Sequence, residues 1–241
     1  MVDERFKRIR ALLGEEAMEE IAKKRVAVFG VGGVGSFVVE GLVRSGIREI
    51  DIIDSDKVVL SNLNRQIMAS EKTIGKAKVD ALEERIHDID PNILVHKYVS
   101  FYLPEKKDEF PFEDYDYIVD AIDTVTAKIS LITEAEERNI PVISSMGCGN
   151  RLDPSKLCMT DIYKTKGDPL SKVMRRELRK RGVKRLKVVY STEEPVKLRE
   201  EIVEEGRRST PGSSIFVPAS AGLLIASVVI RELAEGNKTV R

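Results

Sequence analysis

Short apolar runs alternate with amphipathic segments along the first 145 residues. Five runs have the length and continuous hydrophobicity of strands buried on both faces; they occupy residues 26–29, 49–53, 94–99, 117–121 and 141–145. Apolar residues at helical spacing mark four other stretches, the first of them in two pieces: 3–24, 34–44, 76–89 and 127–138. This alternation predicts an α/β fold with a mostly parallel sheet and helices on both faces.

After residue 149 the pattern changes. Two further strands are predicted at 156–162 and 187–191, on either side of a basic helix at 169–181. Because they fall outside the alternation, we expect an antiparallel extension. The stretch 191–214 combines Pro and Gly with many charges, which is typical of a mobile loop.

A last helix is predicted at 219–235 and is rich in small residues, among them Ala219, Ala221, Gly222 and Ala226. Small side chains on an apolar helix need a close partner surface, and a homodimer interface would supply one. We expect a single domain over 1–241, in which residues 1–150 form the core and 151–241 the extension.

The amino-acid composition limits the partners, metal sites and cellular compartments that fit this protein. The 40 basic residues balance the 40 acidic ones, so net charge predicts no partner. Cys148 and Cys158 are too few for the paired knuckles of a zinc ribbon, and they fit a reducing compartment. The charged first residues resemble no signal peptide, which predicts a cytoplasmic protein. Residues 211–230 carry no charge, but Pro218 and several Ser and Gly favour a buried helix over a membrane segment.

A glycine-rich turn follows the first strand. Gly30, Gly32 and Gly35 satisfy G-x-G-x-x-G between a strand and a helix, where backbone N–H groups face a phosphate. Asp54, 19 residues beyond Gly35, ends the next strand and is placed to bind ribose hydroxyls. The pattern predicts a Rossmann-like nucleotide-binding core, but by itself it does not choose between hydride transfer and ATP chemistry.

Residues further along favour ATP. Ser61, Asn62 and Asn64 precede Arg65 and Gln66, and Lys78 lies near the start of the next predicted helix. Arg65 and Lys78 can neutralise a triphosphate and stabilise charge on a departing pyrophosphate. Asp123 follows the strand at 117–121, where ligands of open α/β sheets bind, and a carboxylate beside phosphates is a natural Mg²⁺ ligand.

Four motifs together are more specific than the glycine turn alone: "GVGGVGS", "DSDKVVLSNLNRQ", "GKAKV" and "DAIDT". In order and spacing they resemble the ubiquitin-activating-type adenylyltransferases. The resemblance implies ATP and Mg²⁺ as cofactors and attack of a carboxylate on the α-phosphate. It places Gly32 and Gly35 at the phosphates, Asp54 at the ribose and Asp123 on the metal. The candidate ATP-binding residues are Gly30, Gly32, Gly33, Gly35, Asp54, Asp56, Asn62, Arg65, Gln66 and Lys78.

In dimers of these adenylyltransferases an arginine near the N-terminus reaches into the partner subunit's site. Arg8 fits this role best, with Arg5 and Arg10 as alternatives. A solvated helix face is the competing interpretation for any one of them. The resemblance therefore implies a homodimer with Arg8, Arg65, Lys78 and Asp123 as catalytic residues.

The segments "PVISSMGCGNRLDPSKL", "VVYSTEEP" and "SSIFVPASAGLLIASVVIREL" resemble the branch that dehydrates threonylcarbamoyladenosine in tRNA. That branch implies ATP-dependent ring closure of the modified nucleoside through an acyl-adenylate, with release of AMP and pyrophosphate. A nucleophile in the same side chain closes the ring, so no catalytic cysteine is required. Cys148 is better explained as a small buried side chain. A sulfur-transfer protein partner stays an open possibility.

Between residues 164 and 187 there are 11 Lys or Arg and two acids, Asp168 and Glu177. Such a run usually forms a solvated face, but one of nearly single sign can bind tRNA phosphates. Its candidate tRNA-binding residues are Lys172, Arg175, Arg176 and Arg179. Three alternative functions remain: activation of a ubiquitin-like sulfur carrier, disfavoured by the missing zinc cysteines; an NAD-dependent oxidoreductase; and a non-catalytic nucleotide-sensing scaffold.

Overall fold

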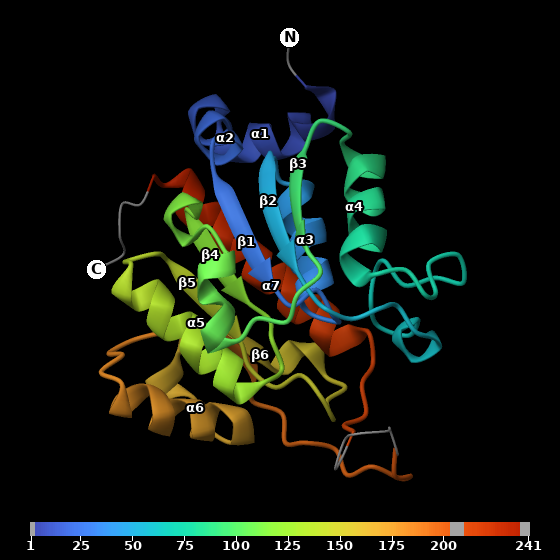
Figure 1. Cartoon of the computed structure of the whole chain (residues 1–241), viewed down its shortest axis with the longest axis vertical. Coiled ribbons are helices and arrows are strands. Elements are labelled where there is room, and N and C mark those ends of the chain that lie inside the picture. Colours follow the sequence, from blue (N-terminus) through green and yellow to red (C-terminus); the bar gives the residue numbers. More distant parts are fainter. Residues whose placement is uncertain (1–2, 203–209, 237–241) are drawn as a thin grey trace.

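One seven-stranded sheet runs through the molecule in the order β3-β2-β1-β4-β5-β7-β6 (Figure 1). The computed structural model describes residues 3–202 and 210–236. The strands are β1 Arg25–Phe29, β2 Glu49–Ile53, β3 Leu94–Tyr98, β4 Tyr117–Asp120, β5 Val142–Ser145, β6 Leu157–Asp161 and β7 Lys187–Ser191. Every pairing is parallel except that of β6 with β7. The expected mostly parallel sheet is confirmed.

Helices cover both faces of this sheet. They are α1 Lys7–Leu13, α2 Glu15–Ala22, α3 Gly35–Val43, α4 Lys78–Ile89, α5 Val125–Glu137, α6 Pro169–Lys180 and α7 Phe216–Ala234. Short 3₁₀ helices are η1 Glu4–Phe6, η2 Leu60–Asn62, η3 Pro104–Glu109, η4 Phe112–Asp114, η5 Pro154–Lys156 and η6 Ile162–Lys164. The apolar residues of α3, α4 and α7 share one core cluster, and those of α5 and α6 pack in clusters on the other face.

The C-terminal part of the chain continues the same sheet. β7 pairs in parallel with β5, with Ile143 opposite Lys187, and β6 then adds an antiparallel edge strand. The expected antiparallel extension is therefore confirmed at β6, whereas β7 belongs to the parallel part. Because β5 is one of the parallel strands, the residues after Ser145 lie at the carboxyl end of the sheet.

Helix α7 packs tightly on α3 of its own chain. A side chain at Gly222 would approach the carbonyl oxygen of Val34 to 2.5 Å, and one at Gly41 would approach Ala226 to 2.6 Å. The small residues of α7 thus find their close partner surface on α3 of the same chain, so a subunit interface is not needed to supply it. By length and composition α7 could cross a membrane, but 56% of its apolar window is buried inside the protein.

The parallel strands all end at one edge of the sheet, and α1 and α2 lie at the opposite edge (Figure 1). The glycine turn follows β1, Asp54 follows β2, and Asp123 follows β4. Because carboxyl ends of neighbouring parallel strands meet, these three segments come together. They form the walls of the cavity described next.

Candidate active site

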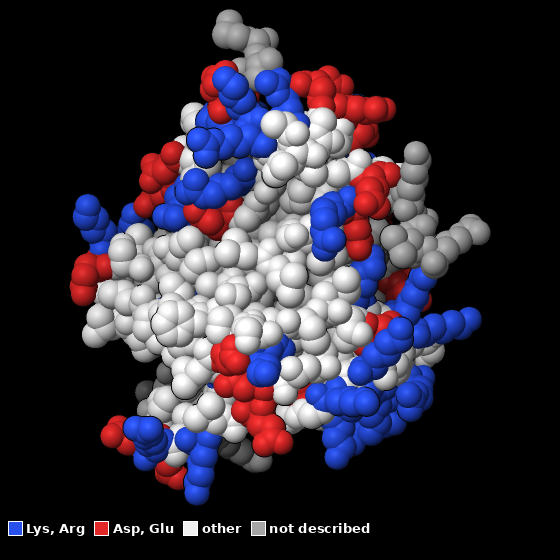
Figure 2. All heavy atoms as spheres, turned by 180° about the vertical axis from the view of Figure 1, so that it is seen from behind, with Lys and Arg blue, Asp and Glu red and all other residues white. Residues whose placement is uncertain are grey.

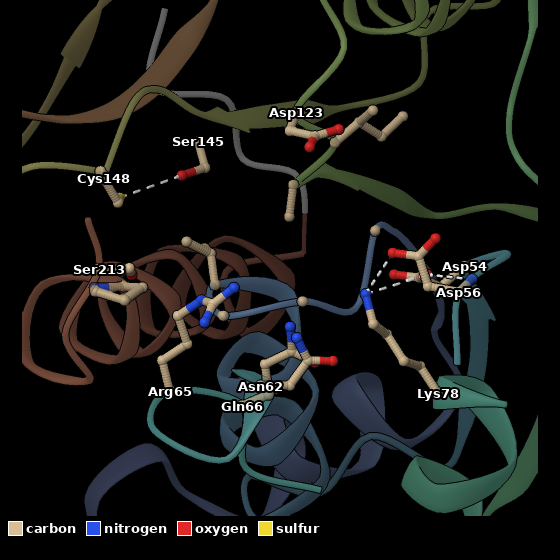
Figure 3. A pocket seen from close by; sticks show the side chains of 18 of the residues that line it. Asp54, Asp56, Asn62, Arg65, Gln66, Lys78, Asp123, Ser145, Cys148 and Ser213 are labelled. Atoms are coloured by element: carbon tan, nitrogen blue, oxygen red, sulfur yellow. Dashed lines mark hydrogen bonds and ion pairs between the residues drawn. The ribbon is translucent and has the colours of Figure 1, made fainter. Parts of the chain in front are cut away.

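A cavity of about 820 Å³ opens at the carboxyl ends of β1, β2, β4 and β5 (Figure 3). This volume suits a nucleotide-sized ligand with room beside it. Its lining includes nine of the ten candidate ATP-binding residues and Asp123. The tenth, Gly35, lies behind the glycine turn instead.

The turn contains glycine for two different structural reasons. Gly30 has φ +85°, and a side chain there would approach the Ala121 carbonyl oxygen to 2.7 Å. A side chain at Gly35 would lie 1.8 Å from the Gly30 carbonyl oxygen. Gly32 and Gly33 have no such close neighbour and face the cavity. Gly30 and Gly35 therefore allow the turn to fold, and Gly32 and Gly33 leave room for a ligand's phosphates.

The carboxylate of Asp54 is fixed by the backbone on both sides. Its Oδ2 accepts the N–H of Val31 at 2.9 Å, and its Oδ1 accepts the N–H of Asp56 at 2.9 Å. Burial raises the pKa of Asp54, and the nearby ammonium of Lys78 opposes that rise. A carboxylate has about four lone-pair sites, so two remain for the ribose hydroxyls expected here.

Lys78 begins α4 and is buried between two carboxylates (Figure 3). Its Nζ donates to Asp56 Oδ2 at 2.6 Å and lies 3.7 Å from Asp54 Oδ1. A bound phosphate would compete with Asp56 for this ammonium. The geometry thus holds Lys78 at the cavity wall in a preset position.

The loop after β2 supplies the remaining polar groups. Asn62 Oδ1 accepts the Val59 N–H at 3.2 Å, and Arg65 Nη1 donates to the Ser61 carbonyl at 2.7 Å. Gln66 is buried, and among the described residues its Oε1 has no hydrogen-bond partner. Buried acceptors without a partner are costly, so Gln66 fits a site whose bound ligand donates to it.

Asp123 lies opposite Arg65 in the cavity, exposed, with the Thr124 hydroxyl 3.3 Å from its Oδ1. Over residues 3–202 and 210–236 no group of three His, Cys, Asp or Glu side chains could form a complete metal cage. Mg²⁺ is commonly held by one or two carboxylates together with substrate phosphates. One carboxylate beside a phosphate site fits that kind of binding.

The other end of the cavity is lined by residues from β5 onward. Ser145, Cys148 and Ser213 lie there (Figure 3), together with Leu170 and Thr210. Burial raises the pKa of the Cys148 thiol to about 11, so the thiol is protonated at neutral pH. Ser145, Cys148 and Ser213 fall within segments that carry the family resemblance, but no role was predicted for either serine, and Leu170 and Thr210 were not predicted at all.

The loop over 191–214 is anchored where the structure describes it; residues 203–209 lie outside the described part. Asn150 accepts the Val196 N–H at 2.7 Å with its carbonyl and the Gly212 N–H at 2.7 Å with Oδ1. A side chain at Gly149 would approach Pro211 to 2.8 Å. These contacts hold Pro211 and its neighbours against the cavity wall.

Arg8 lies on α1, at the opposite edge of the sheet from the cavity of its own chain (Figure 1). Arg5 pairs with Asp3 and Asp90, and Arg10 pairs with Glu15. Within the described residues Arg8 has no ion pair, and it is exposed. Of the three N-terminal candidates it is the one available to another molecule.

The basic residues of α6 lie together at the surface, where Figure 2 shows blue side chains at lower right. A shallow hollow of about 380 Å³ is lined by Lys172, Arg175, Arg176, Arg179 and Lys180. Arg175 is half-buried and donates to the Thr165 carbonyl at 3.0 Å, so it also holds α6 in place. The Arg179 guanidinium lies 5.2 Å from the centre of the Tyr163 ring.

Residues 6–229 match the ThiF family. The chain belongs to the ThiF family. This ThiF family member is 41% identical to the tRNA threonylcarbamoyladenosine dehydratase of Bacillus subtilis, over 95% of this chain and 94% of the relative. The match confirms the expected adenylyltransferase family and the branch within it.

Solved structures of the Escherichia coli tRNA N6-threonylcarbamoyladenosine dehydratase are similar to this ThiF family member as well. The complex with AMP has 32% identity and a TM-score of 0.87, covering 98% of this chain and 96% of that one. The complex with ATP has a TM-score of 0.86 at 32% identity, covering 97% and 95%. The likeness covers nearly the whole chain, including β6, β7 and α6.

Proposed function

We infer that the protein is an ATP-dependent tRNA threonylcarbamoyladenosine dehydratase. The observation that carries this inference is the 41% identity to the Bacillus subtilis dehydratase over nearly the whole of both chains. The cavity supports it, since its charged residues gather where a nucleotide would lie. We expect this enzyme in the cytoplasm, and a sulfur-transfer protein partner remains a prediction.

The cavity's own residues suggest how ATP is held. Gly32 and Gly33 expose their backbone to the phosphates, and Asp54 is fixed for the ribose hydroxyls. Arg65 and Lys78 place positive charge on the triphosphate, where it stabilises the charge that develops on pyrophosphate. Asp123 would hold Mg²⁺, which when bound neutralises phosphate charge and polarises the α-phosphate.

Adenylation makes the substrate's carboxylate reactive. A carboxylate oxygen forms a bond to the α-phosphorus, and the bond from that phosphorus to the bridging oxygen breaks, so pyrophosphate leaves with the electron pair. A nucleophile of the same side chain then attacks the activated carbonyl and loses its proton, and AMP leaves with the former carboxylate oxygen. The net change in the nucleoside is the loss of one water. Because the reacting groups belong to one side chain, proximity provides much of the rate.

This route needs no enzyme nucleophile. The Cys148 thiol, the nearest candidate, has a pKa raised to about 11 and is therefore largely protonated. Its position in the cavity wall fits a small neutral side chain beside the substrate.

The decisive test follows AMP and pyrophosphate release from Mg²⁺ and ATP. One reaction contains tRNA that carries threonylcarbamoyladenosine, and a second contains the same tRNA without it; nucleoside mass is then measured. Release only with modified tRNA, with loss of one water from the nucleoside, is expected. Release stimulated by a ubiquitin-like carrier instead, or by neither substrate, would require withdrawal of the dehydratase function.

We further propose that two copies of the chain form a homodimer in which Arg8 enters the partner's cavity. Arg8 lies far from its own cavity and has no ion pair in the described chain. The face that carries α7 shows a broad band without charged side chains (Figure 2), and Phe216 and Leu223 of α7 are exposed. Such a face suits a subunit interface.

Mixing two inactive variants tests this arrangement. Arg8→Ala and Asp123→Ala are each expected to lose AMP formation. If Arg8 acts across the interface, a mixed dimer has one intact site, and random exchange restores about a quarter of wild-type activity. Arg65→Ala mixed with Asp123→Ala is the control, because both residues belong to one cavity and no intact site can form. Equal recovery, or none, in both mixtures contradicts the proposal.

A further inference from the structure

An ion pair is completely buried beneath the turn that carries Asp123. Asp120 is the last residue of β4 and Lys128 lies in the first turn of α5; both have 0% exposure. Lys128 Nζ lies 2.9 Å from Asp120 Oδ2. Neither side chain reaches the cavity, and the chemistry described above gives neither of them a role.

The pair is connected to the backbone next to Asp123. Lys128 Nζ donates to the Ile122 carbonyl at 3.0 Å, and Asp120 Oδ1 accepts the Ile122 N–H at 3.2 Å. The Ser144 hydroxyl of β5 donates to Asp120 Oδ2 at 2.5 Å. Both polar backbone groups of Ile122 are thus held by the pair, one residue before Asp123.

The same turn rests on the glycine turn at its other side. The Ala121 carbonyl oxygen would lie only 2.7 Å from a side chain at Gly30. The turn from Ala121 to Asp123 therefore lies between the glycine turn and the buried pair. The position of this turn therefore determines the distance between the Asp123 carboxylate and any phosphate bound at Gly32 and Gly33.

A buried ion pair adds little net stability to a folded protein. Removing two charges from water costs about as much as their attraction returns, and apolar pairs of the same volume are often at least as stable. Hydrogen bonds to Ile122, by contrast, need polar atoms at fixed positions.

We propose that Asp120, Lys128 and Ser144 are positioning residues that hold the Asp123 carboxylate where it would bind a divalent cation together with ATP. This rests on the proposed function, because it assigns the metal to Asp123. The three act through the backbone of Ile122 and touch neither nucleotide nor metal.

The test measures metal binding apart from turnover. Binding of Mn²⁺ to the protein–ATP complex is followed by electron paramagnetic resonance without tRNA, beside ATP affinity without metal and the thermal unfolding midpoint. Lys128→Met alone leaves a buried carboxylate without its partner and can fail to fold. The main variant is therefore Asp120→Asn with Lys128→Met, and Ser144→Ala and Lys128→Arg complete the series.

The double variant is expected to bind Mn²⁺ about 10- to 100-fold more weakly, with metal-free ATP affinity unchanged. Ser144→Ala should shift Mn²⁺ affinity in the same direction by a smaller factor, and Lys128→Arg should retain most of it. Asp168→Asn with Arg151→Met is the matched control, since it removes both charges of another buried pair, whose members do not line the cavity. It should lower the unfolding midpoint without changing Mn²⁺ affinity.

Unchanged Mn²⁺ affinity in both the double variant and Ser144→Ala would overturn the proposal and leave the pair a structural element. If the double variant does not fold, unchanged affinity in Ser144→Ala overturns it alone. Asp123→Ala distinguishes failure of the positioning role from failure of the metal assignment itself. If that variant binds Mn²⁺ like wild type, the metal assignment to Asp123 fails first.

Discussion

The two ends of the cavity differ in charge and in how their side chains are fixed (Figure 3). At the nucleotide end Asp54, Asp56 and Lys78 form a hydrogen-bonded group, and Arg65 lies between this group and Ser213. At the far end the described lining residues carry hydroxyl, thiol and apolar groups, and none is charged: they are Ser145, Met146, Gly147, Cys148, Gly149, Leu170, Thr210, Pro211 and Ser213.

This difference separates two tasks. Fixed charges are useful where charge moves during the reaction, which in adenylation is at the phosphates. Neutral groups on the opposite side can position a nucleoside without competing for its carboxylate. Under the proposed function, activation would therefore be concentrated at one end of the cavity and substrate placement at the other.

The largest effects are expected from substitutions of two glycines at the nucleotide end, which separate the folding of the turn from phosphate binding. Gly35→Ala puts a methyl 1.8 Å from the Gly30 carbonyl oxygen, so we expect a loss of about 3 kcal/mol in unfolding free energy. Gly32→Ala has its nearest neighbour, Gln66 Nε2, at 3.9 Å and should fold normally. It should instead slow AMP formation on the order of 10- to 100-fold by displacing the phosphates.

Denaturant unfolding and ATP titration check both variants. Normal ATP affinity in Gly32→Ala would mean that no phosphate lies against this residue. Normal stability in Gly35→Ala would contradict the packing of the turn itself.

The nucleotide end could be predicted from sequence because its determinants are local. A strand, a glycine turn and a helix follow one another within about 20 residues, and Asp54 ends the next strand. Asp123 was found because strand and helix alternate, which places it at the carboxyl edge. These are properties of short windows, and no long-range contact is needed to recognise them.

The far end could not be predicted because it depends on sheet order. β7 lies between β5 and β6 in the sheet, and Leu170 and Ser213, which are distant from β5 in the sequence, line the same cavity as the residues after β5. The partner of α7 was missed for the same reason, since α3 precedes it by about 180 residues. Sequence spacing likewise gave no sign that Arg175 holds α6 through Thr165.

A second, moderate effect is expected where α6 meets the far end. Its N-cap Asp168 lies 3.3 Å from where a side chain at Gly147 would stand, and Leu170 lines the cavity. Lys172→Glu with Arg179→Glu should weaken tRNA binding about tenfold and reduce its salt dependence by about two charges.

ATP affinity should stay unchanged in this variant, which filter binding and nucleotide titration would show. Lys23→Glu, at the C-cap of α2, is the control for altered charge alone, because α2 lies at the other end of the molecule (Figure 1). If both variants weakened tRNA binding equally, the basic residues of α6 would form only a solvated surface and not a tRNA-binding site.

The smallest effect is expected at Cys148. Because its pKa is raised to about 11, the thiol is neutral from pH 7 to 9 and no thiolate takes part in adenylation. Cys148→Ser should keep kcat within about threefold of wild type over that range. In the unmodified protein the rate of alkylation by iodoacetamide should be slow and should still be rising at pH 10, measured by intact mass with Cys148→Ser as the blank for Cys158. An alkylation rate that levels off below pH 9, or a large loss of AMP formation in Cys148→Ser, would instead indicate a reactive thiolate at the far end. The two ends of the cavity would then not differ in charge as described.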